Sequence, residues 1–272
     1  MDEQPLNMAF GLVTYMWGAD WNLETLLRAC REAGVPGVEL RTTHAHGVEP
    51  SLSAARRAEV RRQFEAAQIT LVGIGSNERF DSPDADTLAR AVAAAKRFIE
   101  LSHDVGGSGV KVKPDRFHPN VPHRDTIRQI GHALRELGEF GEGFGQQIRL
   151  EVHGQCAQPA TIEAIMKVAD HDNVRICWNS NRQDLQPPGL TANFQRLRRW
   201  FGSTLHVREL DSTAYPFQKL LDLLRASHYE GWVLLEGTHF PKPTPERIAA
   251  LRAQRERFDQ MVARRSGQIK PR

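Results

Sequence analysis

The stretch QIRLEVH at residues 147–153 alternates strictly between apolar and charged or polar side chains. In an extended chain the apolar side chains share one face, and the opposite face carries Arg149, Glu151 and His153. A strand covered on both faces usually reads apolar throughout. The stretch therefore predicts a buried strand with one polar face, and that polar face needs a structural or functional reason.

The same alternation recurs along the chain, in five other short stretches: 37–41, 109–113, 174–179, 204–209 and 232–236. Two apolar stretches, 10–15 and 70–75, bring the number of expected strands to eight. Amphipathic segments follow the strands and predict helices at about 23–34, 51–68, from Ser82-Pro83 to about 102, 124–140, 159–170, near Phe194, 215–227, and from Thr244-Pro245 onward.

Eight strand–helix units in 272 residues give 34 residues a unit. Alternating strands and helices indicate an α/β protein with a parallel sheet, and eight units are typical of a single (β/α)8 TIM barrel. We expect one domain over residues 1–272. A doubly wound open sheet is the alternative, and it is less favoured because no Gly-x-Gly-x-x-Gly motif follows the first strand.

The composition is that of an ordinary globular protein, with 40% hydrophobic and 25% charged residues. The formal net charge of +3 is too small to indicate nucleic-acid binding. No apolar run is long enough for a membrane helix, and the first residues do not resemble a secretory signal. Three widely spaced cysteines make no disulfide framework, so we expect a cytoplasmic protein without membrane or nucleic-acid partners.

Polar residues on the predicted inner faces lie near the carboxyl ends of the strands, where TIM-barrel enzymes hold their active sites. They are Glu39, Lys113, Glu151, His153, Asn179, His206, Arg208 and Glu236.

Four of these residues share a regular spacing. Glu151, Asn179, His206 and Glu236 are separated by 28, 27 and 30 residues, about one strand–helix unit each, so they are expected at equal depth. Two carboxylates, an imidazole and an amide oxygen suit one divalent ion such as Mn²⁺, Mg²⁺, Co²⁺ or Zn²⁺. The alternative is an internal salt-bridge network, for example between Glu151 and Arg208.

The motifs LEVHG (150–154), LHVR (205–208) and LLEG (234–237) resemble those of the xylose-isomerase-like TIM-barrel family, the sugar phosphate isomerase/epimerase superfamily that also includes endonuclease IV-type enzymes. The resemblance implies one metal ion held by residues ending four successive strands, here Glu151, Asn179, His206 and Glu236. The family pattern has aspartate where this chain has Asn179. The site would then hold two carboxylates rather than three, with weaker affinity for the metal.

The resemblance also implies a mechanism. A metal ion chelates the carbonyl and adjacent hydroxyl oxygens of a small sugar or polyol, and Glu151 and Glu236 remove and return a proton through an enediolate. Substrate-binding candidates are His153, Lys113, Arg208, Glu39 and His239. Two of them have a stated structural alternative. Lys113 would be an ion-paired rim residue, and Arg208 would be the partner of Glu151 or Glu39, a role that is slightly favoured for Arg208.

We therefore expect a metal-dependent sugar isomerase, epimerase or allied lyase with a small carbohydrate substrate. Because no compact phosphate-binding glycine loop is evident, an unphosphorylated substrate is favoured. The first alternative is a non-catalytic ligand-binding barrel with a degenerate metal site at Asn179. A less favoured alternative is an endonuclease IV-type nuclease. The resemblance also favours a homo-oligomer.

Overall fold

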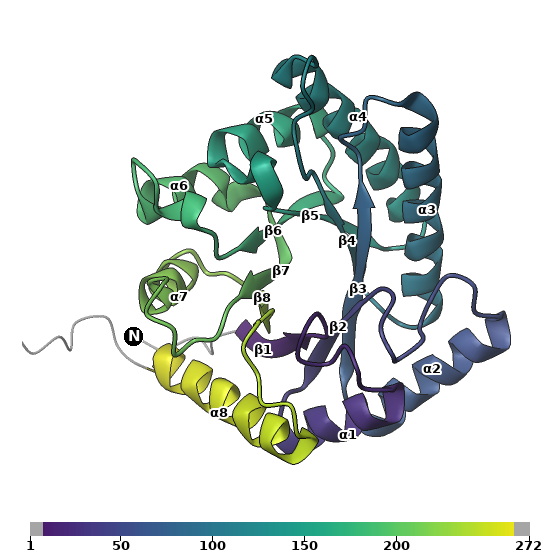
Figure 1. Ribbon diagram of the computed structural model, residues 1–272, viewed down its shortest axis with the longest axis vertical. Coiled ribbons are helices and arrows are strands. Elements are labelled where there is room, and N and C mark those ends of the chain that lie inside the picture. The colour runs from purple at the N-terminus through teal and green to yellow at the C-terminus, as the bar shows by residue number, and fades with distance from the viewer. Residues whose placement is uncertain (1–7, 264–272) are drawn as a thin grey trace, which may run out of the picture.

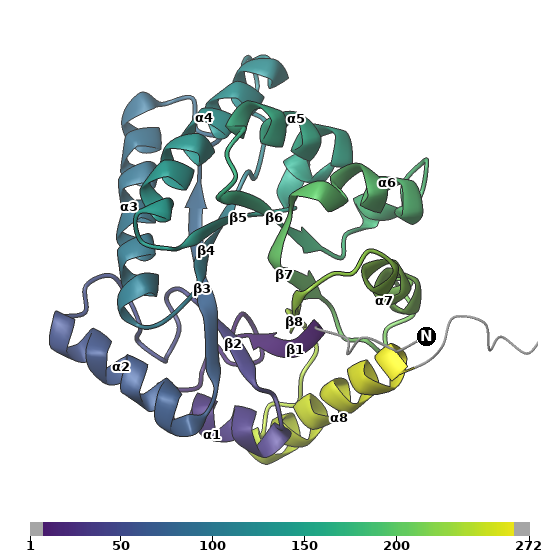
Figure 2. The same ribbon diagram turned by 180° about the vertical axis from the view of Figure 1, so that it is seen from behind.

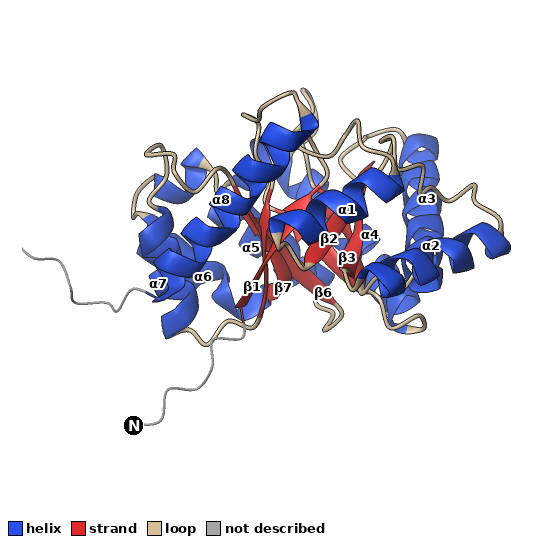
Figure 3. Cartoon of the chain, turned by 90° about the horizontal axis from the view of Figure 1, so that it is seen from below, coloured by secondary structure: helices blue, strands red, loops and turns tan. Residues whose placement is uncertain are grey.

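Eight parallel strands close on themselves in chain order in the computed structural model, which describes residues 8–263. Each strand pairs with the next, and the last strand pairs with the first. Helices surround this ring in both end-on views (Figures 1 and 2), and the side view shows the strands enclosed by helices (Figure 3). The predicted (β/α)8 TIM barrel is confirmed, and the open-sheet alternative is wrong.

The strands are β1 (Met8–Val13), β2 (Gly37–Arg41), β3 (Thr70–Arg79), β4 (Gly109–Lys113), β5 (Gln147–Glu151), β6 (Val174–Asn179), β7 (Phe201–Val207) and β8 (Gly231–Leu235). The helices are α1 (Leu23–Ala33), α2 (Ala54–Ala67), α3 (Ala85–Asp104), α4 (His123–Glu142), α5 (Pro159–Ala169), α6 (Leu190–Leu197), α7 (Phe217–Ala226) and α8 (Thr244–Ala263). Three short 3₁₀ helices are η1 (Gly154–Ala157), η2 (Arg182–Leu185) and η3 (Arg198–Trp200).

The ends of several elements differ from the sequence-based prediction. Strand β5 ends at Glu151 and not at His153, because the chain turns into η1 through Gly154 at φ +68°. A side chain there would lie 2.2 Å from the carbonyl oxygen of Asp115, so the turn requires glycine. Strand β7 ends at Val207 rather than at residue 209, and β8 ends at Leu235.

Helix α3 begins two residues later than the Ser82-Pro83 pair suggested. The N-cap is Asp84, whose carboxylate accepts a hydrogen bond from the backbone N–H of Thr87 at 2.7 Å. The Ser82 hydroxyl instead accepts from the Asp84 N–H at 3.3 Å, which shapes the turn before the helix.

Apolar side chains that point outward from the strands pack against the helices and make the main core. Inside the barrel, the lower end is filled by the Arg149 guanidinium, which donates to the carbonyl of Val72 and the hydroxyl of Ser108 at 3.0 and 2.8 Å. Side chains at Gly73 or Gly109 would lie within 3 Å of this guanidinium, so both positions make room for it. The upper part of the interior is left to the polar residues described below.

Within residues 8–263, no helix combines the length and apolar character needed to cross a membrane. The expected single domain of 1–272 includes residues 1–7 and 264–272, which lie outside the described residues, so that extent stays a prediction.

Candidate metal and proton-transfer site

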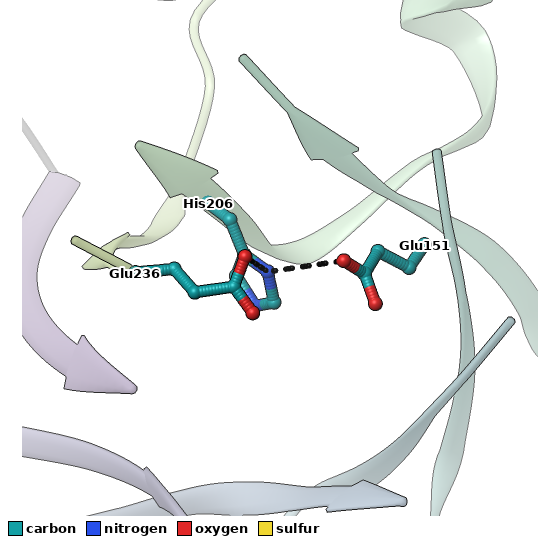
Figure 4. Close-up of side chains that lie close together, drawn as sticks. All are labelled: Glu151, His206 and Glu236. Atoms are coloured by element: carbon teal, nitrogen blue, oxygen red, sulfur yellow. Dashed lines mark ion pairs between the residues drawn. The ribbon is translucent and has the colours of Figure 1, made fainter. Parts of the chain in front are cut away.

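Three side chains from different strands converge inside the carboxyl-terminal end of the barrel (Figure 4). Glu151 ends β5, His206 lies in β7, and Glu236 directly follows β8. His206 Nδ1 lies 3.6 Å from Glu236 Oε2 and 4.0 Å from Glu151 Oε1, and one ligand atom of each residue lies within 4.8 Å of the others. All three side chains are buried. Because β5 and β8 lie on different sides of β7, the carboxylates approach the imidazole from two sides.

Glu236 keeps its place although β8 has ended one residue earlier. Its backbone N–H donates to the carbonyl of Val207 at 2.8 Å, so the chain continues alongside β7 for one more residue. The side chain therefore points inward with the parity expected from the sequence pattern.

Asn179, at the end of β6, adjoins this cluster. Its Nδ2 donates to Glu151 Oε1 at 3.0 Å, whereas its Oδ1 is buried without a hydrogen-bond partner. The four residues predicted at equal depth thus lie together, with Asn179 attached through Glu151.

Lys111 of β4 is a member of the cluster that the sequence-based prediction missed. Its Nζ lies 2.6 Å from Glu151 Oε2, and its side chain is fully buried. The signal was present, because Lys111 has the same parity as Lys113 on β4, but the prediction favoured the residue nearer the strand end. The alternative salt bridge from Arg208 to Glu151 or Glu39 does not form, since Lys111 takes that role for Glu151.

Glu39 of β2 lies below the cluster and is fully buried. Its Oε1 lies 3.3 Å from Nε2 of His206, and the opposite ring nitrogen faces Glu236. Gly75 of β3 makes room for this carboxylate, because a Cβ there would lie 2.9 Å from Glu39 Oε1. Glu39 therefore supports His206 from beneath.

Electrostatics inside the cluster favours a cation beside the carboxylates. Burial alone would raise the pKa of Glu151, but the Lys111 ammonium and His206 hold that pKa well below its usual range. Burial disfavours a charged imidazole at His206, yet Cys177 and Glu236 raise its pKa well above the ordinary value. The same negative surroundings that attract a proton to His206 attract a metal ion.

The donor types and unpaired atoms of the cluster fit a divalent ion. The carboxylates of Glu39, Glu151 and Glu236 surround His206, and the cationic groups of Lys111, Lys113 and Arg149 act on them. Both ring nitrogens of His206 and Oδ1 of Asn179 are buried without hydrogen-bond partners. Such carboxylate, imidazole and amide donors suit a dication of intermediate hardness.

The remaining substrate-binding candidates surround the cluster at different depths. Lys113 is buried at the end of β4, and burial together with the nearby Lys111 ammonium lowers its pKa. His153 Nδ1 lies 3.1 Å from Oδ1 of Asp115 at the rim. Arg208 donates through one guanidinium nitrogen to the carbonyl of Glu236 at 3.0 Å.

The side chain of His239 is not brought to the cluster, since it is 92% exposed. Its backbone N–H donates to Glu209, which holds the loop after β8 against the end of β7. Trp17 and Trp21, which follow β1, are buried in the core. His46 uses both ring nitrogens to fix its own loop, one facing the carbonyl of Arg41 and the other accepting from the N–H of Val48.

Comparisons with known proteins agree with this architecture. The model of a family described as "Xylose isomerase-like TIM barrel" matches residues 27–181. No curated protein matches the sequence.

Solved structures similar to this chain include three relatives of low sequence identity. L-ribulose 3-epimerase is 18% identical, with a TM-score of 0.79 and coverage of 96% of this chain and 99% of that chain. The 3-keto-D-glucoside 4-epimerase from E. coli is 17% identical, with a TM-score of 0.75 and coverage of 93% and 98%. The IOLI protein with a bound zinc atom is 16% identical, with a TM-score of 0.78 and coverage of 94% and 98%.

At these identities the structural likeness shows a shared fold. The family match spans more than half of the chain and includes β5, β6 and their site residues Glu151 and Asn179. The resemblance drawn from the sequence motifs is thereby confirmed, and the chain belongs to the xylose isomerase-like TIM barrel family.

Proposed function

We propose that the protein is a divalent-metal-dependent epimerase or isomerase, which moves a proton on a small hydroxylated sugar or polyol through an enediolate. The observation that carries the proposal is the placement of two buried carboxylates, Glu151 and Glu236, on two sides of His206 (Figure 4). Epimerisation requires a proton to leave one face of a carbon and to return to the other, so it needs acid–base groups on both sides.

The metal ion would be held by Glu151, His206 and Glu236, with Oδ1 of Asn179 as a fourth donor. When bound, a dication polarises the substrate carbonyl and stabilises the negative charge of an enediolate. Glu39 beneath His206 keeps the imidazole oriented toward the opening of the barrel.

The two carboxylates differ in their surroundings, and this difference suggests separate roles. Oε2 of Glu151 contacts the Lys111 ammonium at 2.6 Å, which makes Glu151 the weaker base. Glu236 contacts His206 and has no ammonium partner among the described residues. We assign proton removal to Glu236, which becomes protonated, and proton return on the other face to the Lys111–Glu151 pair, in which the Lys111 ammonium would supply the proton that Glu151 delivers.

The structural neighbours support this class of reaction. They include L-ribulose 3-epimerase and D-psicose 3-epimerase with D-tagatose from Clostridium cellulolyticum H10, and the IOLI structure contains zinc. A panel of ketoses with Mn²⁺, Co²⁺, Mg²⁺ and Zn²⁺ is the appropriate screen.

The test is exchange of a substrate C–H hydrogen for deuterium in D₂O, followed by NMR for each ketose and metal. We expect metal-dependent exchange that Glu151→Gln and Glu236→Gln each abolish. Glu246→Gln, at an exposed position on α8, is the matched control and should leave exchange unchanged. Exchange that persists in both site variants, or in chelated protein, would contradict the proposal.

The alternative of a non-catalytic ligand-binding barrel predicts sugar binding without exchange under every metal. An endonuclease IV-type nuclease uses three metal ions, whereas residues 8–263 contain a single group of three or more converging metal-ligand side chains. Cytoplasmic location and homo-oligomerisation stay predictions.

A further inference from the structure

A cavity of about 740 Å³ lies beside the metal cluster, between the segments that follow β6 and β7. Its wall includes Ser180, which directly follows Asn179, and Arg208, two residues after His206. Tyr215 and Phe217 contribute aromatic surface. The volume is within the range of small-molecule sites, and Ser180 and Arg208 lie just beyond the ends of the strands that carry Asn179 and His206.

The charge of this cavity is one-sided. Two arginines, Arg182 and Arg208, line it, and none of its described lining residues is an aspartate or glutamate. Among residues 8–263, neither arginine lies within ion-pair distance of a carboxylate, and the sole hydrogen bond that either side chain makes there is that from Arg208 to the carbonyl of Glu236. Most of their N–H groups are therefore free to bind a ligand.

A second cavity, which includes the β6 residue Arg175 and η3, shows that this imbalance is not a general property of the surface. It is also lined by two arginines, Arg175 and Arg199, but three acidic residues accompany them: Glu142, Asp170 and Asp172. A third cavity, on the other side of Arg208, is lined by Glu209 and Asp211. The excess of positive charge therefore belongs to the side of Arg208 that faces Arg182.

Guanidinium groups only donate hydrogen bonds, whereas sugar hydroxyls need acceptors as well as donors. A carboxylate or phosphate accepts through several oxygens and matches the planar fork of arginine. The backbone N–H of Arg208 donates to the Ser180 hydroxyl at 3.3 Å, and its side chain donates to the carbonyl of Glu236. These bonds hold Arg208 beside the backbone of Glu236, so Arg208 links this cavity to the edge of the cluster.

We propose that this cavity binds an oxyanion group of the substrate, so that the natural substrate is a sugar acid or sugar phosphate rather than a neutral sugar. The proposal rests on the proposed function, in that it takes the same barrel mouth as the substrate site. It gives Arg182, a residue without a role in the sequence-based prediction, a part in selecting the substrate.

The test compares three probes with nearly the same chain of hydroxyl groups: neutral D-glucitol, D-gluconate with a carboxylate, and D-glucitol 6-phosphate. Binding is measured by calorimetry on chelator-treated protein at constant ionic strength. Because no metal or turnover is involved, the result does not depend on proton transfer. A failed exchange experiment with successful anion binding would overturn the reaction alone, and the reverse result would overturn the anion site alone.

We expect at least one anionic probe to bind roughly tenfold more tightly than D-glucitol. The stronger of the two anions then identifies carboxylate or phosphate as the natural group. Arg182→Gln and Arg208→Gln should each reduce that preference severalfold, while Arg199→Gln in the second cavity should preserve it. Since Arg182 is exposed, its replacement tests the proposal without disturbing the core.

Three outcomes would overturn the proposal. These are equal affinity for neutral and anionic probes, an anion preference that survives both arginine replacements, and no detectable binding of either anion up to about 20 mM.

Discussion

Replacing Lys111 with methionine would leave the Glu151 carboxylate buried without its ammonium partner. Nζ and Oε2 lie 2.6 Å apart, and the two side chains are 0% and 1% exposed. Removal of one member of a buried ion pair costs roughly 3–5 kcal/mol, because the other charge stays desolvated. Methionine keeps an unbranched apolar stem, so little of the loss should come from an empty cavity. We therefore expect the free energy of unfolding of the metal-free protein to fall by about 3–5 kcal/mol.

Urea unfolding followed by circular dichroism, with chelator present, measures this loss. The cycle includes Lys111→Met, Glu151→Gln and the double variant. The double variant should be more stable than Lys111→Met alone, because it no longer buries an unpaired charge, and the coupling should exceed about 2 kcal/mol. A loss of less than about 1 kcal/mol for Lys111→Met would refute the view that this ion pair is central to the cluster.

Three further predictions test individual positions. Burial raises the pKa of Asp184 to about 7 from 3.8, so between these values the folded protein retains a proton that the unfolded chain loses. The free energy of unfolding should therefore fall from pH 4 to pH 7 by up to about 4 kcal/mol. Urea titrations of Asp184→Asn should lack this pH-dependent component. Gly75→Ala would place a Cβ 2.9 Å from the Glu39 carboxylate and should lower the free energy of unfolding by about 1–3 kcal/mol, which a lower melting temperature would reveal. Gly143→Ala, where a Cβ has room, should leave the melting temperature unchanged. Asn179→Asp adds a carboxylate to the site, so calorimetry should show Mn²⁺ binding roughly tenfold more tightly or better; unchanged affinity would mean that residue 179 is not a ligand.

The inner polar face of the barrel could be predicted from the sequence because it depends on a local property. Alternation with a period of two fixes which side chains share a face, whatever the neighbouring strands do. Glu151 and His206 reach the cluster for this reason. Their spacing of about one strand–helix unit per step also places them at similar depth, because each unit returns the chain to the same end of the barrel.

The partners inside the barrel could not be predicted in the same way, because they depend on register between strands. Lys111 lies opposite Arg149 in the pairing of β4 with β5, and its long side chain then reaches Glu151, one inward position further along. The sequence pattern instead suggested Arg208 as the structural partner of that carboxylate. The ends of β5 and β7 were missed for a related reason, since they depend on where hydrogen bonds to the adjacent strands stop.

The central claim is that Glu151, His206 and Glu236 hold one divalent ion, and metal content per chain tests it most directly. Inductively coupled plasma mass spectrometry would be applied to protein purified without chelator or histidine tag, alongside Glu236→Gln and the control Glu246→Gln. We expect close to one ion per chain in the natural protein and the control, and a large loss in Glu236→Gln. Absence of metal even after incubation with Mn²⁺, Co²⁺ and Zn²⁺, or equal metal content in Glu236→Gln, would contradict the claim.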